Sequence, residues 1–195
     1  MEKELNNLHD RNFHADLQIQ DSNSSDQNNS TAYKFLLKNS QLINLLEDEL
    51  KDIYWSEKVI AKSISKMIQR ATSNALIEAL EIHLEEKAEH IKRVENAFEL
   101  IEKEPAEKKC KAVLSLIEEG EVMMFDCAAG VGCDEAIISA GKKVEHYEIG
   151  VYGTLYKFVE NLGLSDVASI LKKTLIEEIA ADKKLSEIAA CIYIH

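Results

Sequence analysis

Residues 143–149 read KVEHYEI, a stretch that sets two carboxylates into an apolar helical face. Glu145 and Glu148 are three residues apart, so they project from the same side of a helix as Tyr152. Burial of a carboxylate costs several kcal/mol, roughly, unless a positive group compensates its charge. The stretch therefore predicts a helix that carries a cation-binding pair into the interior of a bundle.

Acidic side chains recur on the inward faces of three further expected helices. Glu57 lies within the apolar stripe of the first, and Glu86 and His90 share one side of the second. Glu178 and Asp182 are four residues apart on the last. Four helices that bring acids inward at similar depth predict a metal centre between them. The candidate ligands are Glu57, Glu86, His90, Glu145, Glu148, Glu178 and Asp182.

A bound metal is the expected compensation because the sequence offers no set of core lysines or arginines. Lys87 lies beside the inward face and is expected to extend its ammonium into water. A pairing between Lys87 and the acids would weaken the argument for a metal. His83 shares the side of Glu86 and His90 and is expected to orient a ligand rather than bind directly. The oxygen-rich ligand set favours two iron or manganese ions per chain over zinc or copper.

Apolar residues recur every three or four positions from about residue 39 onward, which predicts helices. Asp134 is the expected N-cap of the third long helix, and Gly163 suits the stop after it. The connection over residues 104–133 is long and includes one amphipathic piece. We therefore predict an all-α, ferritin-like four-helix bundle with a long crossover between the second and third helices. The expected long helices span about residues 39–70, 75–102, 134–162 and 165 to near the C-terminus.

The composition narrows the classes of partner. The chain of 195 residues carries 23 basic and 35 acidic side chains, a formal net charge of −12. Such an acidic protein is a poor candidate for binding nucleic acid or an anionic membrane. No apolar run approaches the roughly 20 residues of a membrane span, and no apolar signal segment is evident, so a cytoplasmic protein is expected. Residues 1–38 are polar and low in complexity, which predicts a disordered tail ahead of a bundle domain over residues 39–195.

Four cysteines are present, Cys110, Cys127, Cys133 and Cys191, and no two form a C-x-x-C pair. A zinc or thioredoxin-type site is therefore a weak interpretation. Cys127 and Cys133 lie close together in an expected loop, so a disulfide between them stays open. Separate reduced thiols are the favoured state in a cytoplasm.

Several of these motifs together are similar to a known family. The chain resembles the YciE/YciF branch of the ferritin-like superfamily over about residues 40–190. The resemblance implies a dimeric four-helix bundle with a di-metal centre and a role in bacterial stress response. Wider superfamily members carry Glu-x-x-His, whereas both ligand pairs here are four residues apart and one ends in Asp182. The matching motifs are DELKDIY at 48–54, HLEE at 83–86 with His90, KKC at 108–110, LIEEG at 116–120, KVEHYEI at 143–149, and EE at 177–178 with AD at 181–182.

The expected chemistry is oxidation at a carboxylate-bridged di-iron or mixed iron–manganese centre that oxidises Fe(II) or consumes peroxide or O₂. Glu86 and Glu178 are the expected bridges. Two alternatives stay open: a non-enzymatic dimeric bundle with a structural metal or none, and a manganese catalase. Glu57 and Glu148 would be terminal ligands, with His90 and Asp182 completing the two metals.

Overall fold

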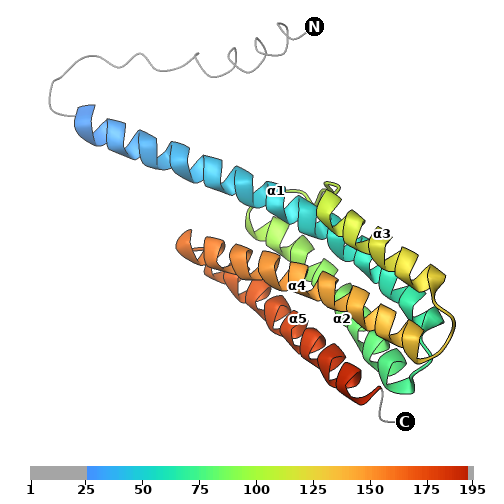
Figure 1. The fold of residues 1–195 in the computed structure, drawn as a ribbon. Helices are drawn as coiled ribbons and strands as arrows, with labels where there is room; N and C mark the ends of the chain where they lie inside the picture. The colour runs from blue at the N-terminus through green and yellow to red at the C-terminus, as the bar shows by residue number, and fades with distance from the viewer. Residues whose placement is uncertain (1–25, 193–195) are drawn as a thin grey trace, which may run out of the picture. The chain divides into compact units, whose positions relative to one another are not determined.

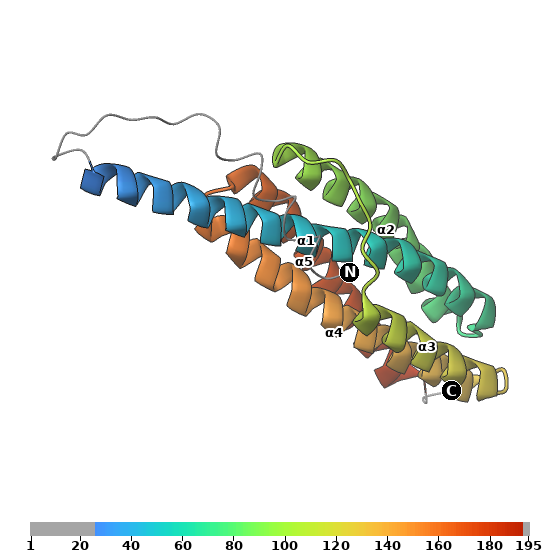
Figure 2. The ribbon, with the colours of Figure 1, turned by 90° about the horizontal axis from the view of Figure 1, so that it is seen from above.

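The computed structural model describes the backbone of residues 26–192 and the side chains of residues 40–192. This part of the chain contains five helices and no β-strand (Figure 1). The helices are α1 (Asp26–Arg70), α2 (Asn74–Leu100), α3 (Lys111–Asp126), α4 (Val131–Asn161) and α5 (Ser165–Cys191). Four are long, and the shorter α3 lies in the crossover between α2 and α4, where it packs along α4 (Figures 1 and 2). The predicted all-α bundle with a long crossover is confirmed.

The first helix is longer than the sequence analysis predicts. It begins at Asp26, whereas the apolar spacing places its start near Asn39. No proline or glycine lies between these residues, and extending an existing helix costs far less than nucleating one. From Asn39 onward the chain forms one compact unit. The predicted disordered tail lies, for residues 1–25, outside the described residues.

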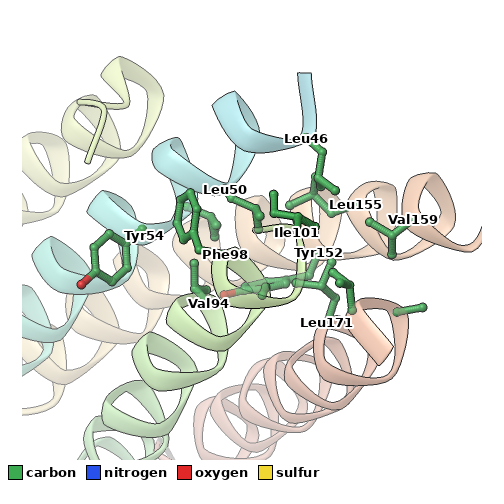
Figure 3. Packing of buried hydrophobic residues seen from close by; sticks show 14 residues of the cluster. Leu46, Leu50, Tyr54, Val94, Phe98, Ile101, Tyr152, Leu155, Val159 and Leu171 are labelled. Carbon is green, nitrogen blue, oxygen red and sulfur yellow. The ribbon is translucent and has the colours of Figure 1, made fainter. Parts of the chain in front are cut away.

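The core of the bundle consists of two apolar clusters, one toward each end of the long helices. In the first, Leu50 of α1, Phe98 of α2 and Tyr152 of α4 are among the packed side chains (Figure 3). In the second, Ile60 of α1 and Ile137 of α4 lie in the same packing unit. Apolar burial of this kind contributes about 25 cal/mol per Å² of surface removed from water. The two clusters therefore hold the long helices together on both sides of the middle section of the bundle.

Buried acidic and basic side chains occupy the interval between the two clusters on every long helix. Their sequence positions fall between the residues of the first cluster and those of the second. We call these side chains the polar layer. It consists of Glu57 on α1, His83, Lys87 and His90 on α2, Glu145 and Glu148 on α4, and Glu178 on α5, all of them buried.

The start of α4 differs from the predicted cap. Helix α4 begins at Val131 after Gly130, so Asp134 lies inside its first turn. The Asp134 carboxylate instead accepts hydrogen bonds from the backbone N–H and hydroxyl of Thr72, both at 2.6 Å, and from the Ser73 N–H at 2.9 Å. Asp134 thus ties the α1–α2 connection to α4, because a buried carboxylate must be hydrogen-bonded and its donors here belong to Thr72 and Ser73.

Substitution of Asp134 by alanine is expected to lower the free energy of unfolding by about 2–3 kcal/mol, because the backbone donors of Thr72 and Ser73 lose their charged acceptor. Urea unfolding would measure the change. Asp166→Ala is the matched control, since Asp166 also lies in a first helical turn but is exposed. A loss no larger than that of the control would show that Asp134 only complements the helix dipole.

Two further predictions concern residues near helix ends. Gly163 has a φ of 75° just after α4, which confirms it as the stop. Cys127 and Cys133 are joined by a disulfide, in contrast to the favoured reduced thiols. Arg70 donates to the Cys127 carbonyl beside this link at 2.8 Å.

Among the described helices, none combines the length and apolar character that crossing a membrane requires.

Candidate metal centre

Helical spacing explains how the polar layer assembles. On α2, His83, Lys87 and His90 are four and three residues apart, so they project from one side. Glu145 and Glu148 share a side of α4 for the same reason. Side chains from four helices therefore meet in one buried volume. Those with no exposed surface are Glu57, Lys87, His90, Glu148 and Glu178.

Lys87 lies at the centre of this volume. Its Nζ donates to Oε1 and Oε2 of Glu148, at 2.7 and 2.6 Å, and to Oε1 of Glu178 at 2.8 Å. Oε2 of Glu57 lies 3.3 Å away. The expectation that Lys87 extends into water is therefore wrong, as is the interpretation that no core cation is available. Three carboxylates around one ammonium replace the hydration that the ammonium loses on burial.

His83 faces a different part of the polar layer. Its Nε2 lies 3.0 Å from Oε1 of Glu145 and 3.8 Å from Oε2 of Glu178. Its Nδ1 lies 3.3 Å from Oε2 of Glu86, at hydrogen-bond distance. A carboxylate on one ring nitrogen fixes the orientation of the other, which is how proteins present histidine to a metal. The structure thus gives His83 the position of a ligand and Glu86 the position of its support.

His90 is held between two acids of different burial. Its Nδ1 lies 3.0 Å from Oε1 of Glu178, and its Nε2 lies 2.9 Å from Oε2 of Glu177. Arg93 pairs with the same Glu177 carboxylate through both guanidinium nitrogens. Tyr152 donates from the other side to Oε1 of Glu57 at 2.5 Å. These contacts hold the ring of His90 and the carboxylate of Glu57 in place.

The acids of the layer differ in how readily they ionise. Burial raises the pKa of Glu148 well above its ordinary value, and the charge of Glu178 adds to this rise. Burial also raises the pKa of Glu145, although His83 opposes the shift. Glu178 is the reverse case, since burial is outweighed by the positive charge of Lys87 and its pKa falls. Lys87 and His90 outweigh burial at Glu57 as well and lower its pKa, so Glu57 and Glu178 are the carboxylates of the layer that stay ionised.

Both histidines are held in the charged form. Burial alone would lower the pKa of His83, but the Glu145 and Glu86 carboxylates outweigh it and raise the pKa to about 9. Glu178 and Glu57 raise the pKa of His90 to about 9 in the same way. A metal ion that binds either imidazole would have to displace this proton.

The donor set fits a metal ion. Two of its buried oxygens, Glu145 Oε2 and Glu178 Oε2, have no hydrogen-bond partner among the described residues. A buried polar atom without a partner costs about 1–3 kcal/mol. A cation between these atoms would satisfy them, so the buried histidines and glutamates are positioned to hold a metal ion.

Two groups of side chains within the described residues have the geometry for an ion. In each group the ligand atoms lie within 4.8 Å of one another, and Glu178 belongs to both. The first group is His83, Glu145, Glu148 and Glu178, and the second is Glu57, His90 and Glu178.

Comparison with known families assigns the chain. The family described as "Domain of unknown function (DUF892)" matches residues 41–193. The chain belongs to this family. Protein YciF of Escherichia coli (strain K12) is 38% identical over 141 residues, which cover 72% of this chain and 85% of that protein. The predicted resemblance to YciF-like proteins is confirmed.

Solved structures of DUF892 relatives share the fold. The E. coli stress protein YciF matches with a TM-score of 0.74 at 34% identity, over 77% of this chain and 95% of that one. YcfI from Rhodopseudomonas palustris, provisionally described as a structural protein, matches with a TM-score of 0.73 at 38% identity, over 74% and 92%. A protein from Xanthomonas campestris, at 23% identity and a TM-score of 0.64, shows the fold alone.

Two of the predicted ligands in this DUF892 chain lie outside the polar layer. Glu86 is partly exposed and contacts His83. Asp182 is also partly exposed, and it pairs with Lys142 at 2.6 Å and His146 at 3.1 Å. Each lies at the edge of its helix face. There it contacts a nearby basic side chain and does not extend into the polar layer. Ligation by Glu86 and Asp182 stays a prediction that this geometry does not favour.

A cavity of about 260 Å³ adjoins the His83 part of the layer. Its walls are largely apolar, with Ile64 and Leu80 among them, and His83 and Glu145 line it as well. Exposed Ile82 is part of the lining, so the cavity reaches the surface. A small uncharged molecule can therefore approach His83 from solvent.

Sequence reasoning undervalued two members of the site. It expected Lys87 outside and treated His83 as a support, although both have the same helical spacing as His90. That spacing of four and three residues was a signal that Lys87 lies on the same side, but Glu86 has an equivalent spacing of three and four, so the pattern alone could not choose between them.

Proposed function

We propose that this protein is a ferritin-like stress-response protein whose polar layer holds iron or manganese, and that the metal-loaded protein oxidises Fe(II) or consumes peroxide. The observation that carries the proposal is the pair of buried oxygens without hydrogen-bond partners, Glu145 Oε2 and Glu178 Oε2, beside the buried ring of His83. The E. coli relative is described as a stress protein, which supports the physiological role. A homodimer, which the family resemblance implies, and a cytoplasmic location, which the sequence analysis expects, are part of the proposal.

The side chains have separable tasks in this proposal. His83, Glu145 and Glu178 would hold the ion, and Glu86 would keep the His83 ring in place through Nδ1. Iron or manganese, when bound, would supply the electrons that reduce an O–O bond. The apolar walls of the cavity beside His83 would admit peroxide or O₂ while excluding large reductants. The sequence analysis predicts two ions per chain, and Lys87 bears directly on that number.

A second candidate function rests on Lys87. Because its ammonium compensates three carboxylates, the bundle has a source of positive charge that needs no metal. A non-enzymatic bundle that works through its surface would then suffice, and the provisional description of YcfI as a structural protein agrees with it. A manganese catalase is the variant of the first proposal in which manganese, rather than iron, supports peroxide breakdown.

Metal loading followed by turnover separates these functions. Chelated protein would be loaded anaerobically with Fe(II) or Mn(II), analysed for bound metal, and then assayed for peroxide loss. We expect metal-dependent turnover that falls at least about 100-fold in His83→Ala, because a direct ligand is lost. His146→Ala is the matched control, since His146 is exposed. Metal that binds without turnover would favour the structural function, and turnover equal in both variants would remove His83 from the site.

A further inference from the structure

The two oxygens of Glu178 divide the polar layer into two sides. Oε1 faces Lys87 Nζ at 2.8 Å and His90 Nδ1 at 3.0 Å. Oε2 faces His83 Nε2 at 3.8 Å and has no hydrogen-bond partner among the described residues. The same carboxylate therefore meets an ammonium and the His90 ring on one side, and only the more distant His83 ring on the other.

On the Oε1 side the place of a metal ion is already filled. An ammonium has three donors, and Lys87 uses them on the two oxygens of Glu148 and on Glu178. A metal ion bonds carboxylate oxygens at about 2.0–2.2 Å. An ion bound to Glu148 and to Oε1 of Glu178 would consequently fall within contact distance of Nζ. Lys87 and a metal cannot both occupy this side.

The position of Lys87 on its helix points the same way. Lys87 precedes His90 by three residues, which is the spacing of the Glu-x-x-His pair in di-metal carboxylate bundles. This chain therefore carries a cationic side chain where that pattern carries a metal-bridging carboxylate. The residue that should attract a second ion repels it instead.

The Oε2 side keeps the features of a ligand site. Glu145 Oε2 and Glu178 Oε2 are buried without hydrogen-bond partners within the described residues, and His83 Nε2 lies 3.0 Å from Glu145 Oε1. Glu86 supports the other nitrogen of His83, and the cavity reaches this side. One nitrogen and two carboxylates suit a single divalent ion of the iron or manganese type.

We propose that Lys87 is a built-in cation that fills one of two metal positions, so that the chain binds a single metal ion through His83, Glu145 and Glu178. This inference rests on the proposed metal-binding function and deepens it. It replaces the predicted pair of ions with one ion and one ammonium. Glu57 and Glu148 then serve to hold Lys87 rather than a metal, and His90 contacts Oε1 of Glu178 beside it.

Manganese titration with electron paramagnetic resonance tests the proposal without any activity assay. The metal-free full chain would be titrated with Mn(II), and bound manganese per chain counted. We expect the wild-type protein to bind one ion with the signal of an isolated Mn(II). We expect Lys87→Ala to bind a second ion, with the signal of an exchange-coupled pair, because Glu57, Glu148 and Glu178 lose the ammonium that compensates them.

Matched variants keep the result interpretable. Lys87→Arg retains the charge and is expected to stay at one ion, and Lys92→Ala removes an exposed lysine from the same helix and should do the same. A wild-type chain that binds a coupled pair would overturn the inference while leaving metal binding intact, as would a folded Lys87→Ala chain that still binds one ion. A wild-type chain that binds none would overturn the proposed function and this inference together. The wild-type count and signal decide the matter even if Lys87→Ala does not fold.

Discussion

Replacement of Lys87 by methionine is expected to lower the free energy of unfolding of the metal-free protein by about 3–5 kcal/mol, the cost of removing one partner from a buried ion pair. Methionine retains the length of the lysine side chain but not its charge. Glu148 and Glu178 would lose the ammonium that lies within 2.8 Å of both. Proton uptake by Glu148, whose pKa is already raised, would offset part of the loss.

Urea unfolding of chelated protein would measure this change, with the slope of the transition checked for a common unfolded state. Lys92→Met is the control, because the Lys92 side chain is 67% exposed and its pair with Glu89 is a surface pair. Such pairs contribute about 0–1 kcal/mol. A Lys87→Met loss within that range would mean that water or protons, rather than the ammonium, compensate the carboxylates. Added Mn(II) should restore much of the lost stability, because a ligand that binds only the folded state stabilises it.

Replacement of Glu178 by alanine is expected to weaken Mn(II) binding at least about 100-fold, since ligands and their supports each carry effects of this order. Glu178 is the only carboxylate common to both candidate groups in the described part of the chain. Its pKa is lowered by the positive charge of Lys87, so its carboxylate also carries a full negative charge at neutral pH. No neighbouring side chain can take over both properties.

Calorimetric titration with Mn(II) would measure the affinity of the Glu178→Ala protein, and circular dichroism would confirm that the bundle is intact. Glu187→Ala is the matched control, because Glu187 lies on the same helix with a side chain that is 59% exposed. Unchanged affinity in Glu178→Ala would place the metal elsewhere. Glu86 and Asp182, the predicted ligands at the helix edges, would then be the next residues to replace.

The burial of five of the seven predicted ligands follows from local helix geometry. Residues at steps of three and four share a helix face, and an apolar neighbour on that face indicates which way the face points. The burial of Glu57, His90 and Glu148 was predictable on this ground. The same reasoning could not separate Glu86 from Lys87, which are adjacent in sequence and point about 100° apart around the helix. Which of the two enters the core depends on the rotation of α2 against its neighbours.

Long-range contacts decided the remaining differences. Aspartate is a residue type that favours helix N-caps, which is why Asp134 was predicted to be one. The α1–α2 connection instead lies against Asp134 and supplies hydrogen-bond donors that no local sequence pattern reveals. Asp182 has the spacing of an inward residue. Its carboxylate nevertheless pairs with Lys142 of α4 at the edge of the bundle. In both cases the partner is far away in sequence and close in space.

The sequence by itself determined the all-α class, the long helices, the stop at Gly163 and the gathering of acids in the interior, because helical periodicity and turn chemistry act over a few residues. Only the tertiary structure decided that Lys87 completes the acid cluster, that Glu86 supports His83, and that Glu178 presents a different partner to each oxygen. The physical reason is that a buried charge is stabilised by atoms from several helices at once. Its compensation is therefore a property of how the helices pack.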